Sequence, residues 1–217
     1  MTTKLNEVEA RVLASLVEKQ VTTPEYYPLT LNALVLSCNQ KNNRHPTTSY
    51  DDNSVMQALE SLREKNLVYV FYGSTSRVPK YKHVMPEVLE LNQQELSLLC
   101  VLMLRGAQTL GELRDRAARL HQFSSLEEVD ATLNALSLRD PDPLVMRLPR
   151  QPGQKEARFV HLLCGEPDIE SLQAEPAPRT SRADPDRLSR LEQTVESLRT
   201  EINLLQQQFG DFKKQFE

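Results

Sequence analysis

The chain repeats one order of elements twice. An apolar helical pattern opens at Leu5, and a second opens at Leu91, 86 positions later. Each opening is followed by two further helical patterns and then by two short strand-like runs around a polar turn. A unit of this length is too long for a solenoid repeat. The order helix, helix, helix, strand, strand is that of the winged helix, so the sequence predicts a mainly α chain with small β wings (α+β) and two tandem winged-helix domains.

The domain boundaries follow this repeat and the composition of the remaining chain. We assign the first winged-helix domain to residues 1–86 and the second to residues 87–165. Residues 166–183 contain several prolines among acidic residues, a composition that sustains neither a helix nor a core, and they are expected to be a linker. Residues 184–217 are expected to form a C-terminal helix.

Polar residues before the apolar patterns predict where helices begin. Thr30 and Thr109 are the expected N-caps of the second helix in each domain, because a threonine side chain accepts a hydrogen bond from the first helical turn. Ser54 is the expected N-cap of the third helix in the first domain. Ser124 or Ser125 is expected to have that role in the second domain.

The segment 184–217 has the most regular periodicity in the chain. Its apolar residues recur at alternating spacings of three and four over about four heptads, the pattern of a coiled coil. β-Branched residues at one position and leucine at the other favour a parallel homodimer. The alternative is that this helix folds back onto an apolar groove of its own chain. The heptad seam consists of Leu188, Leu191, Val195, Leu198, Ile202, Leu205, Phe209, Phe212 and Phe216.

Composition restricts the class of protein. The longest apolar run, seven residues from Leu98, is too short to span a bilayer, and the first residues lack the apolar core of a signal peptide. A cytoplasmic protein without membrane contact is therefore expected. Cys38, Cys100 and Cys164 have no partners at ligand spacing, so no metal and no cofactor are predicted. The chain also lacks a glycine-rich phosphate loop and a nucleophile signature, so no catalytic residue and no enzymatic activity are predicted.

Two strings in the first domain, residues 16–34 and residues 38–44 (CNQKNNR), closely resemble the YceH family of bacterial proteins, a family without an assigned function. Residues 104–114 are similar to a second block of that family. The resemblance covers about residues 1–165. It implies a tandem winged-helix fold, and it implies no catalytic residue, no cofactor and no established activity.

Binding of double-stranded DNA through the first domain is the leading functional hypothesis. In a winged helix the third helix usually enters the major groove and the wing contacts the backbone. Asn and Gln can read adenine, Arg can read guanine, and basic residues on the wing can neutralise phosphates. Glu60 and Glu64 on the third helix favour the opposing interpretation, an ordinary solvated face. The candidate DNA contacts are Lys41, Asn43, Arg44, Asn53, Gln57, Arg63, Arg77, Lys80 and Lys82.

A protein-docking module, dimerised by the coiled coil, is the alternative function. The chain carries a net charge of −4, and three acids occupy the first turns of the third helix in the second domain, where they would repel phosphate. Two copies of a docking surface in one dimer would gain avidity. Three arginines of the second domain are expected to pair with neighbouring acids rather than with DNA: Arg114, Arg116 and Arg119.

Aromatic residues gather around the turn and wing of the first domain. Stacking on nucleic-acid bases is one use of such residues. Packing of the wing against the first and third helices is the use that we expect. The residues concerned are Tyr26, Tyr27, Tyr69, Phe71, Tyr72 and Tyr81.

Overall fold

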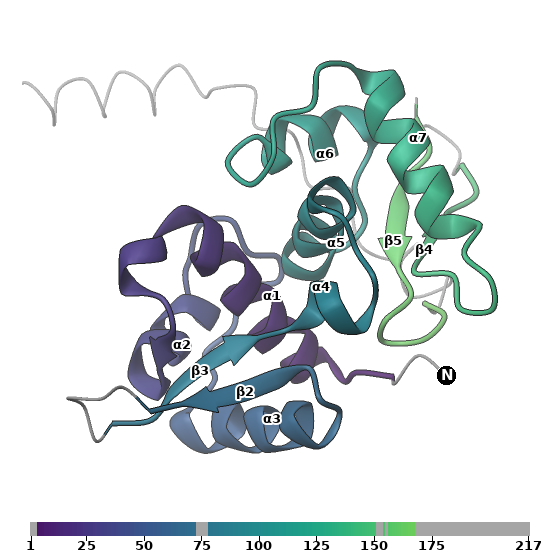
Figure 1. Cartoon of the computed structure of the whole chain (residues 1–217). Helices are drawn as coiled ribbons and strands as arrows, with labels where there is room; N and C mark the ends of the chain where they lie inside the picture. The colour runs from purple at the N-terminus through teal and green to yellow at the C-terminus, as the bar shows by residue number, and fades with distance from the viewer. Residues whose placement is uncertain (1–3, 73–77, 151–153, 155, 168–217) are drawn as a thin grey trace, which may run out of the picture. The chain divides into compact units, whose positions relative to one another are not determined.

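The computed structural model describes residues 4–72, 78–150, 154 and 156–167 (Figure 1). These residues all belong to one compact unit, which spans residues 1–172. The predicted heptad seam lies outside the described residues, as does most of the predicted linker. The coiled coil and the homodimer therefore stay predictions.

The first half of the described chain combines three α-helices with a three-stranded antiparallel sheet. Its elements are α1 (Glu7–Thr22), the short 3-10 helix η1 (Pro24–Tyr26), β1 (Leu29–Thr30), α2 (Leu31–Cys38), α3 (Asp52–Glu64), β2 (Val68–Phe71) and β3 (Lys80–His83). The strand order is β1-β3-β2. Strand β1 is a contribution that the sequence patterns did not predict.

The second half repeats this arrangement after a short connecting helix. Its elements are α4 (Met85–Val88), α5 (Gln93–Arg105), α6 (Leu110–Ala117), α7 (Leu126–Ser137), β4 (Val145–Arg147) and β5 (Phe159–His161). Strands β4 and β5 form a two-stranded antiparallel sheet. Helices with small antiparallel sheets confirm the predicted α+β class. The predicted boundary between residues 86 and 87 falls inside α4.

The two hairpins repeat one register. Val68 pairs with His83 in the first hairpin, and Val145 pairs with His161 in the second. Tyr81 of the first hairpin is paired with Leu29 of β1. In the second half an isolated bridge between Gln108 and Phe159 takes the corresponding place. The internal repeat therefore extends from the order of elements to the pairing of individual residues.

Side-chain caps fix the helix starts. Thr30 and Thr109 cap α2 and α6 as predicted, and Ser125 rather than Ser124 caps α7. The predicted Ser54 cap of α3 is wrong. Asp51 is the N-cap, because its carboxylate accepts a 2.9 Å hydrogen bond from the Ser54 backbone N–H, which makes Ser54 the third residue of the helix.

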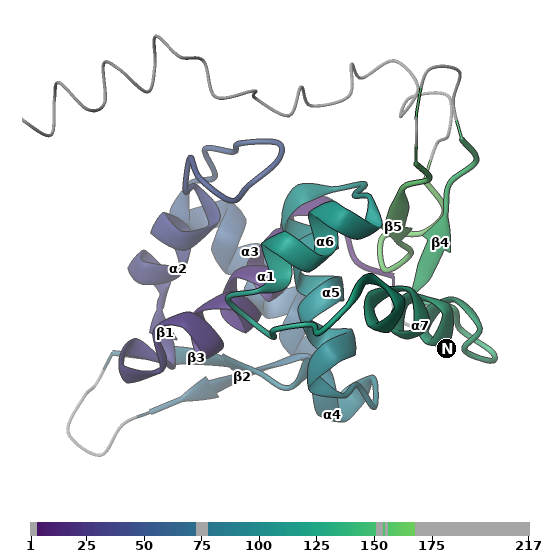
Figure 2. The same ribbon diagram turned by 90° about the horizontal axis from the view of Figure 1, so that it is seen from above.

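Helices α1 and α5 lie side by side at the centre of the unit (Figures 1 and 2). Helix α1 also packs against α2 and α3, whereas α5 packs against α6 and α7. As a result ten consecutive residues of α1, 9–18, and nine of α5, 96–104, are buried. The apolar side chains of both halves join in one core. Cys38 and Cys100 are buried in it, as expected, and the Cys100 thiol donates to the Ala14 carbonyl at 3.4 Å.

No helix among the described residues is long and apolar enough to cross a membrane. Within the same described ranges, no group of three or more His, Cys, Asp or Glu residues is arranged so that it could hold a metal ion.

Candidate nucleic-acid interface

The predicted DNA contacts divide between two sides of the first half. The loop that follows α2 packs against the second half, because the His45 backbone N–H donates to the Leu104 carbonyl at 2.9 Å and Arg105 donates to the side-chain oxygen of Asn43. In Figure 2 this loop lies at the top and the β2–β3 hairpin lies at the bottom. Lys41 and Asn43 are therefore separated from the lysines of β3.

Arg44 lies inside the protein. It is 6% exposed, its Nη2 is 2.6 Å from a carboxylate oxygen of Glu18, and its guanidinium also donates to the Ser37 carbonyl at 3.0 and 3.2 Å. The buried carboxylate of Glu18 needs a charged partner, and Arg44 supplies it. A side chain held in this way does not reach a DNA backbone, so the prediction that Arg44 contacts DNA is corrected.

Helix α3 presents a mixed polar face to solvent. Asn53, Gln57, Glu60 and Glu64 are all exposed, and their spacing of four, three and four residues places them on one side of the helix. Arg63 is exposed as well. The amides suit recognition of base edges, but the two carboxylates on the same face repel phosphate. Attraction to a nucleic acid therefore has to come from another element.

The β2–β3 hairpin carries aromatic rings and lysines on its outer face. Tyr69 lies directly opposite Lys82, and Phe71 lies directly opposite Lys80. Directly opposed residues of antiparallel strands share a face of the sheet. Tyr69 is 55% exposed and Phe71 is 49% exposed. Neither lysine forms an ion pair with any residue that the structure describes. We call these four residues the wing face.

The expectation that the aromatic residues pack against the helices is correct for only part of the set. Tyr81 is buried, and its hydroxyl lies 3.6 Å from the sulfur of Met56 on α3. The expectation is wrong for four exposed residues, Tyr26, Tyr69, Phe71 and Tyr72. The alternation of a strand explains the difference between Tyr81 and the pair Tyr69 and Phe71, because successive side chains point to opposite faces of a sheet. Tyr72 follows the end of β2.

The hairpin also lies near the exposed edge of α3. Burial raises the pKa of the Tyr81 hydroxyl, the charge of Arg63 lowers it, and Tyr72 and Glu60 raise it. Arg63 and Glu60 therefore act electrostatically on the hydroxyl at the inner side of the hairpin. The predicted contact Arg77 lies outside the described residues.

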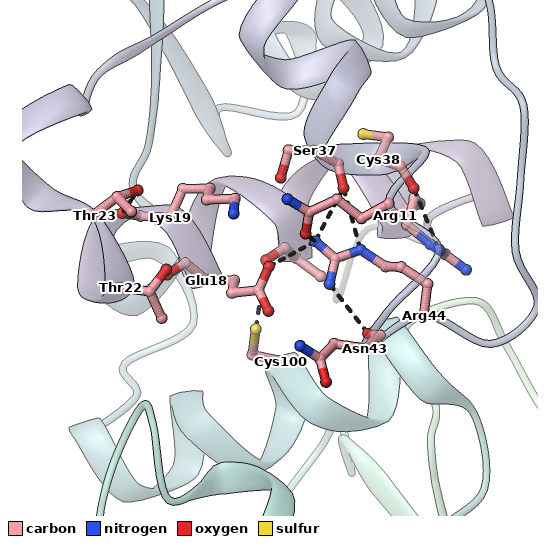
Figure 3. A network of polar contacts seen from close by, with 12 residues as sticks. Arg11, Glu18, Lys19, Thr22, Thr23, Ser37, Cys38, Asn43, Arg44 and Cys100 are labelled. Carbon is pink, nitrogen blue, oxygen red and sulfur yellow. Dashed lines mark hydrogen bonds and ion pairs between the residues drawn. The ribbon is translucent and has the colours of Figure 1, made fainter. Parts of the chain in front are cut away.

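A polar network joins the two halves around Glu18 of α1. Figure 3 shows the Glu18 side chain directed toward Arg44, with Cys100 of α5 nearby. The second oxygen of Glu18 forms an ion pair with Arg119, at a distance of 3.0 Å. Arg119 lies just beyond the end of α6. Burial raises the pKa of Glu18. The hydrogen bond and charge of Arg44, followed by the charges of Lys19 and Arg119, lower it by more, so the pKa lies below its usual range.

Sequence reasoning did not identify Glu18 as the centre of this network. A signal was present, because Glu9, Arg11 and Glu18 interrupt a helix that is otherwise apolar on several sides. Arg11 is buried too, and its Nη2 donates to the Pro46 carbonyl at 2.7 Å, which fastens the loop after α2 to α1.

The predicted pairing with neighbouring acids is confirmed for Arg114 and Arg116. Arg114 lies 3.3 Å from the Asp115 carboxylate, and Arg116 lies 3.3 Å from that of Glu112. Arg119 pairs across the interface with Glu18 rather than within its own half.

The structure defines a class of duplicated α+β protein, in which each half places three helices before an antiparallel hairpin. Within this class, the chain belongs to the family described as "Protein of unknown function, DUF480", whose model matches residues 5–154. This membership confirms the resemblance to the YceH family, which is the same family of proteins under another name.

Similar proteins occur in several bacteria. A UPF0502 protein of Opitutus terrae is 54% identical over 195 residues, which cover 90% of this chain and 83% of the relative. A UPF0502 protein of Geobacter sulfurreducens is 48% identical over 217 residues, or 98% of each chain. A UPF0502 protein of Aeromonas hydrophila is 43% identical over 215 residues, which cover 96% of this chain and 98% of the relative.

Proposed function

We propose that both halves are winged-helix domains and that the first binds double-stranded DNA. The order α1-β1-α2-α3-β2-β3 supports the winged-helix assignment, since a short strand before the second helix joins the wing hairpin in one sheet. The second half supports it with the same order and with the bridge between Gln108 and Phe159.

The wing face is the observation that carries the DNA-binding proposal. Lys80 and Lys82 have no ion-pair partner in the described part of the chain, and they lie directly opposite two exposed rings, Phe71 and Tyr69. Lysines neutralise phosphates, and the rings offer apolar contact to sugars and bases. The chain as a whole carries a charge of −4, so this concentration of cationic residues is not a consequence of its composition.

Helix α3 is the second element of the proposed DNA interface. Its exposed side chains Asn53, Gln57 and Arg63 belong to the residue types that read base edges in the major groove. The carboxylates of Glu60 and Glu64 weaken the attraction to phosphate. The balance favours modest affinity that depends on the wing face.

The coiled coil completes the proposal. A parallel homodimer through the heptad seam of residues 184–217 would pair two first domains and raise the affinity for DNA through avidity. We place the protein in the cytoplasm, where DNA is accessible in a bacterial cell, and the three free cysteines are consistent with that compartment. The proposal assigns no catalytic residue, cofactor or metal to the chain.

Fluorescence anisotropy of a labelled duplex of about 25 base pairs, titrated with the full-length protein, tests this proposal. Replacing Lys80 and Lys82 by Gln should weaken binding and reduce the slope of log affinity against log salt by about 0.9 for each phosphate that is no longer neutralised. Lys4→Gln is the matched control, because Lys4 is an exposed lysine that is not among the candidate DNA contacts. Equal effects of the control and the wing variants would contradict the proposed interface.

A protein-docking module is the second candidate function. The exposed carboxylates Glu60 and Glu64 on α3 favour it, as does the exposed Glu127 at the start of α7. The same titration separates the two candidates. A folded wild-type protein that binds no duplex at about 50 mM salt would favour docking, because phosphate-driven binding is strongest at low salt.

A further inference from the structure

Arginine side chains crowd the region where α5 and α6 meet the loop that follows α2. Arg105 ends α5, Arg116 lies on α6, and Arg119 lies just beyond it. Arg44 comes from the loop, and Arg158 precedes β5. We call these five residues the arginine cluster.

The carboxylates that face this cluster do not balance its charge. The two oxygens of Glu18 are divided between Arg44 at 2.6 Å and Arg119 at 3.0 Å. The two oxygens of Glu112 are divided between Arg116 at 3.3 Å and Arg158 at 3.0 Å. Each carboxylate therefore compensates one of the two guanidinium groups that contact it.

Arg105 adds a further positive charge. Its guanidinium donates to the neutral side-chain oxygen of Asn43, and no carboxylate among the described residues forms an ion pair with it. Burial lowers the pKa of Arg105, the charges of Arg116, Arg119 and Arg44 lower it further, and the charge of Glu18 raises it. Five guanidinium groups thus face two carboxylates, a local excess of three positive charges in an acidic chain.

Three members of the cluster are linked by a chain of contacts, and the cluster can be reached from solvent. Arg119 contacts Glu18, Glu18 contacts Arg44, Arg44 donates to the Asn43 carbonyl at 3.1 Å, and Asn43 accepts from Arg105. The Arg119 side chain is 54% exposed and that of Arg116 is 26% exposed. An arriving anion therefore does not have to open the core.

We propose that Arg105, Arg116 and Arg119 bind a phosphate group at the junction of the two halves. A guanidinium presents paired N–H donors that match the oxygens of a phosphate, and a dianion would offset most of the excess charge. Arg44 and Arg158 are buried or nearly so and act as positioning residues, which hold Glu18 and Glu112 in place. The site is separate from the wing face and does not depend on it.

The phosphate has two possible sources, a nucleic-acid backbone and a free or small-molecule phosphate. One experiment distinguishes them. Thermal unfolding of the full chain is followed in inorganic phosphate and in chloride at equal ionic strength, for the wild type, for Arg105→Gln and for Arg114→Gln. Arg114 is the matched control, because it is an exposed arginine of α6 that pairs with Asp115 outside the cluster. Duplex affinity is measured for the same three proteins.

A saturable rise in unfolding temperature with phosphate, present in the wild type and Arg114→Gln but absent in Arg105→Gln, supports a site for free phosphate. A drop in duplex affinity for Arg105→Gln, with a salt slope smaller by about one, supports a site for backbone phosphate. The proposal is overturned if Arg105→Gln matches the wild type in both measurements. Failure of the wing variants to alter DNA binding would leave the phosphate site standing, so the two proposals fail separately.

Discussion

Replacing Glu18 by Gln should lower the free energy of unfolding by about 3–5 kcal/mol, the range for breaking a buried ion pair by removing one partner. Glu18 is 3% exposed and Arg44 is 6% exposed, with 2.6 Å between their charged atoms. A neutral amide at position 18 leaves the Arg44 guanidinium buried without a counter-charge, and the desolvation of that cation is then uncompensated.

The expected loss in free energy of unfolding comes from the ion pair with Arg44 rather than from the one with Arg119. The Arg119 side chain is 54% exposed, and exposed ion pairs contribute about 0.2–1 kcal/mol. Arg119→Gln is therefore the matched control and should cost no more than about 1 kcal/mol. A double variant, Glu18→Leu with Arg44→Met, should be more stable than Glu18→Gln alone, because it removes both buried charges.

Urea unfolding followed by far-ultraviolet circular dichroism measures these differences. The pKa of Glu18 lies below its usual value in the folded protein, so the ion pair stabilises the fold above the unfolded-state pKa of about 4.5 and is lost as the pH falls through the folded-state pKa. Glu18→Gln should therefore have its largest effect near pH 7 and a smaller one near pH 3. A loss below about 1 kcal/mol at pH 7 would refute the reasoning.

Three further predictions concern other parts of the chain. Burial and then the charge of Lys82 lower the pKa of His83 to about 4, so stability should decrease as the pH is lowered from about 6.5 to about 4. His83→Phe should reduce the slope of stability against pH in urea titrations by up to about 1.4 kcal/mol per pH unit. Leu99→Ala should cost about 2–5 kcal/mol by the same assay, whereas Leu138→Ala, at a position 81% exposed, should cost less than about 0.5 kcal/mol. Replacing Leu198 and Ile202 by Asp should give monomers in light scattering, and an unchanged solution mass would contradict the dimer.

Helix starts were predictable where a capping residue stands directly before an apolar pattern. Thr30 and Thr109 satisfy that condition, and the structure has both caps. Asp51 and Ser54 lie in one polar stretch, and the choice between them depends on which side chain reaches a free N–H group. Geometry decides this, because the Asp51 carboxylate accepts from Ser54 itself.

Side-chain exposure was harder to predict than the secondary structure. Arg44 lies in a polar loop whose sequence predicts exposure to solvent. The loop is instead bonded to α1 and α5, and the Arg44 side chain forms a buried ion pair with Glu18. Tyr69 and Phe71 are hydrophobic enough to suggest packing, yet the register of β2 turns them outward. Both outcomes depend on contacts between residues far apart in the sequence, which local patterns do not encode.

The packing of α1 against α5 was also beyond local patterns. The two helices pack on each other as well as on the helices of their own halves, so they are buried over most of their length. The stretch of buried positions on α5, from Leu96 to Leu104, reflects this double role.

The measurement that tests DNA binding most directly is anisotropy of a labelled random duplex, titrated with the full-length wild-type protein at about 50 and 200 mM salt. Four phosphate contacts, two from the wing lysines of each protomer of a dimer, predict affinity that falls by roughly 150-fold between these two salt concentrations. No binding at about 50 mM salt, from a protein shown to be folded by circular dichroism, would contradict the assignment of the first half as a DNA-binding domain.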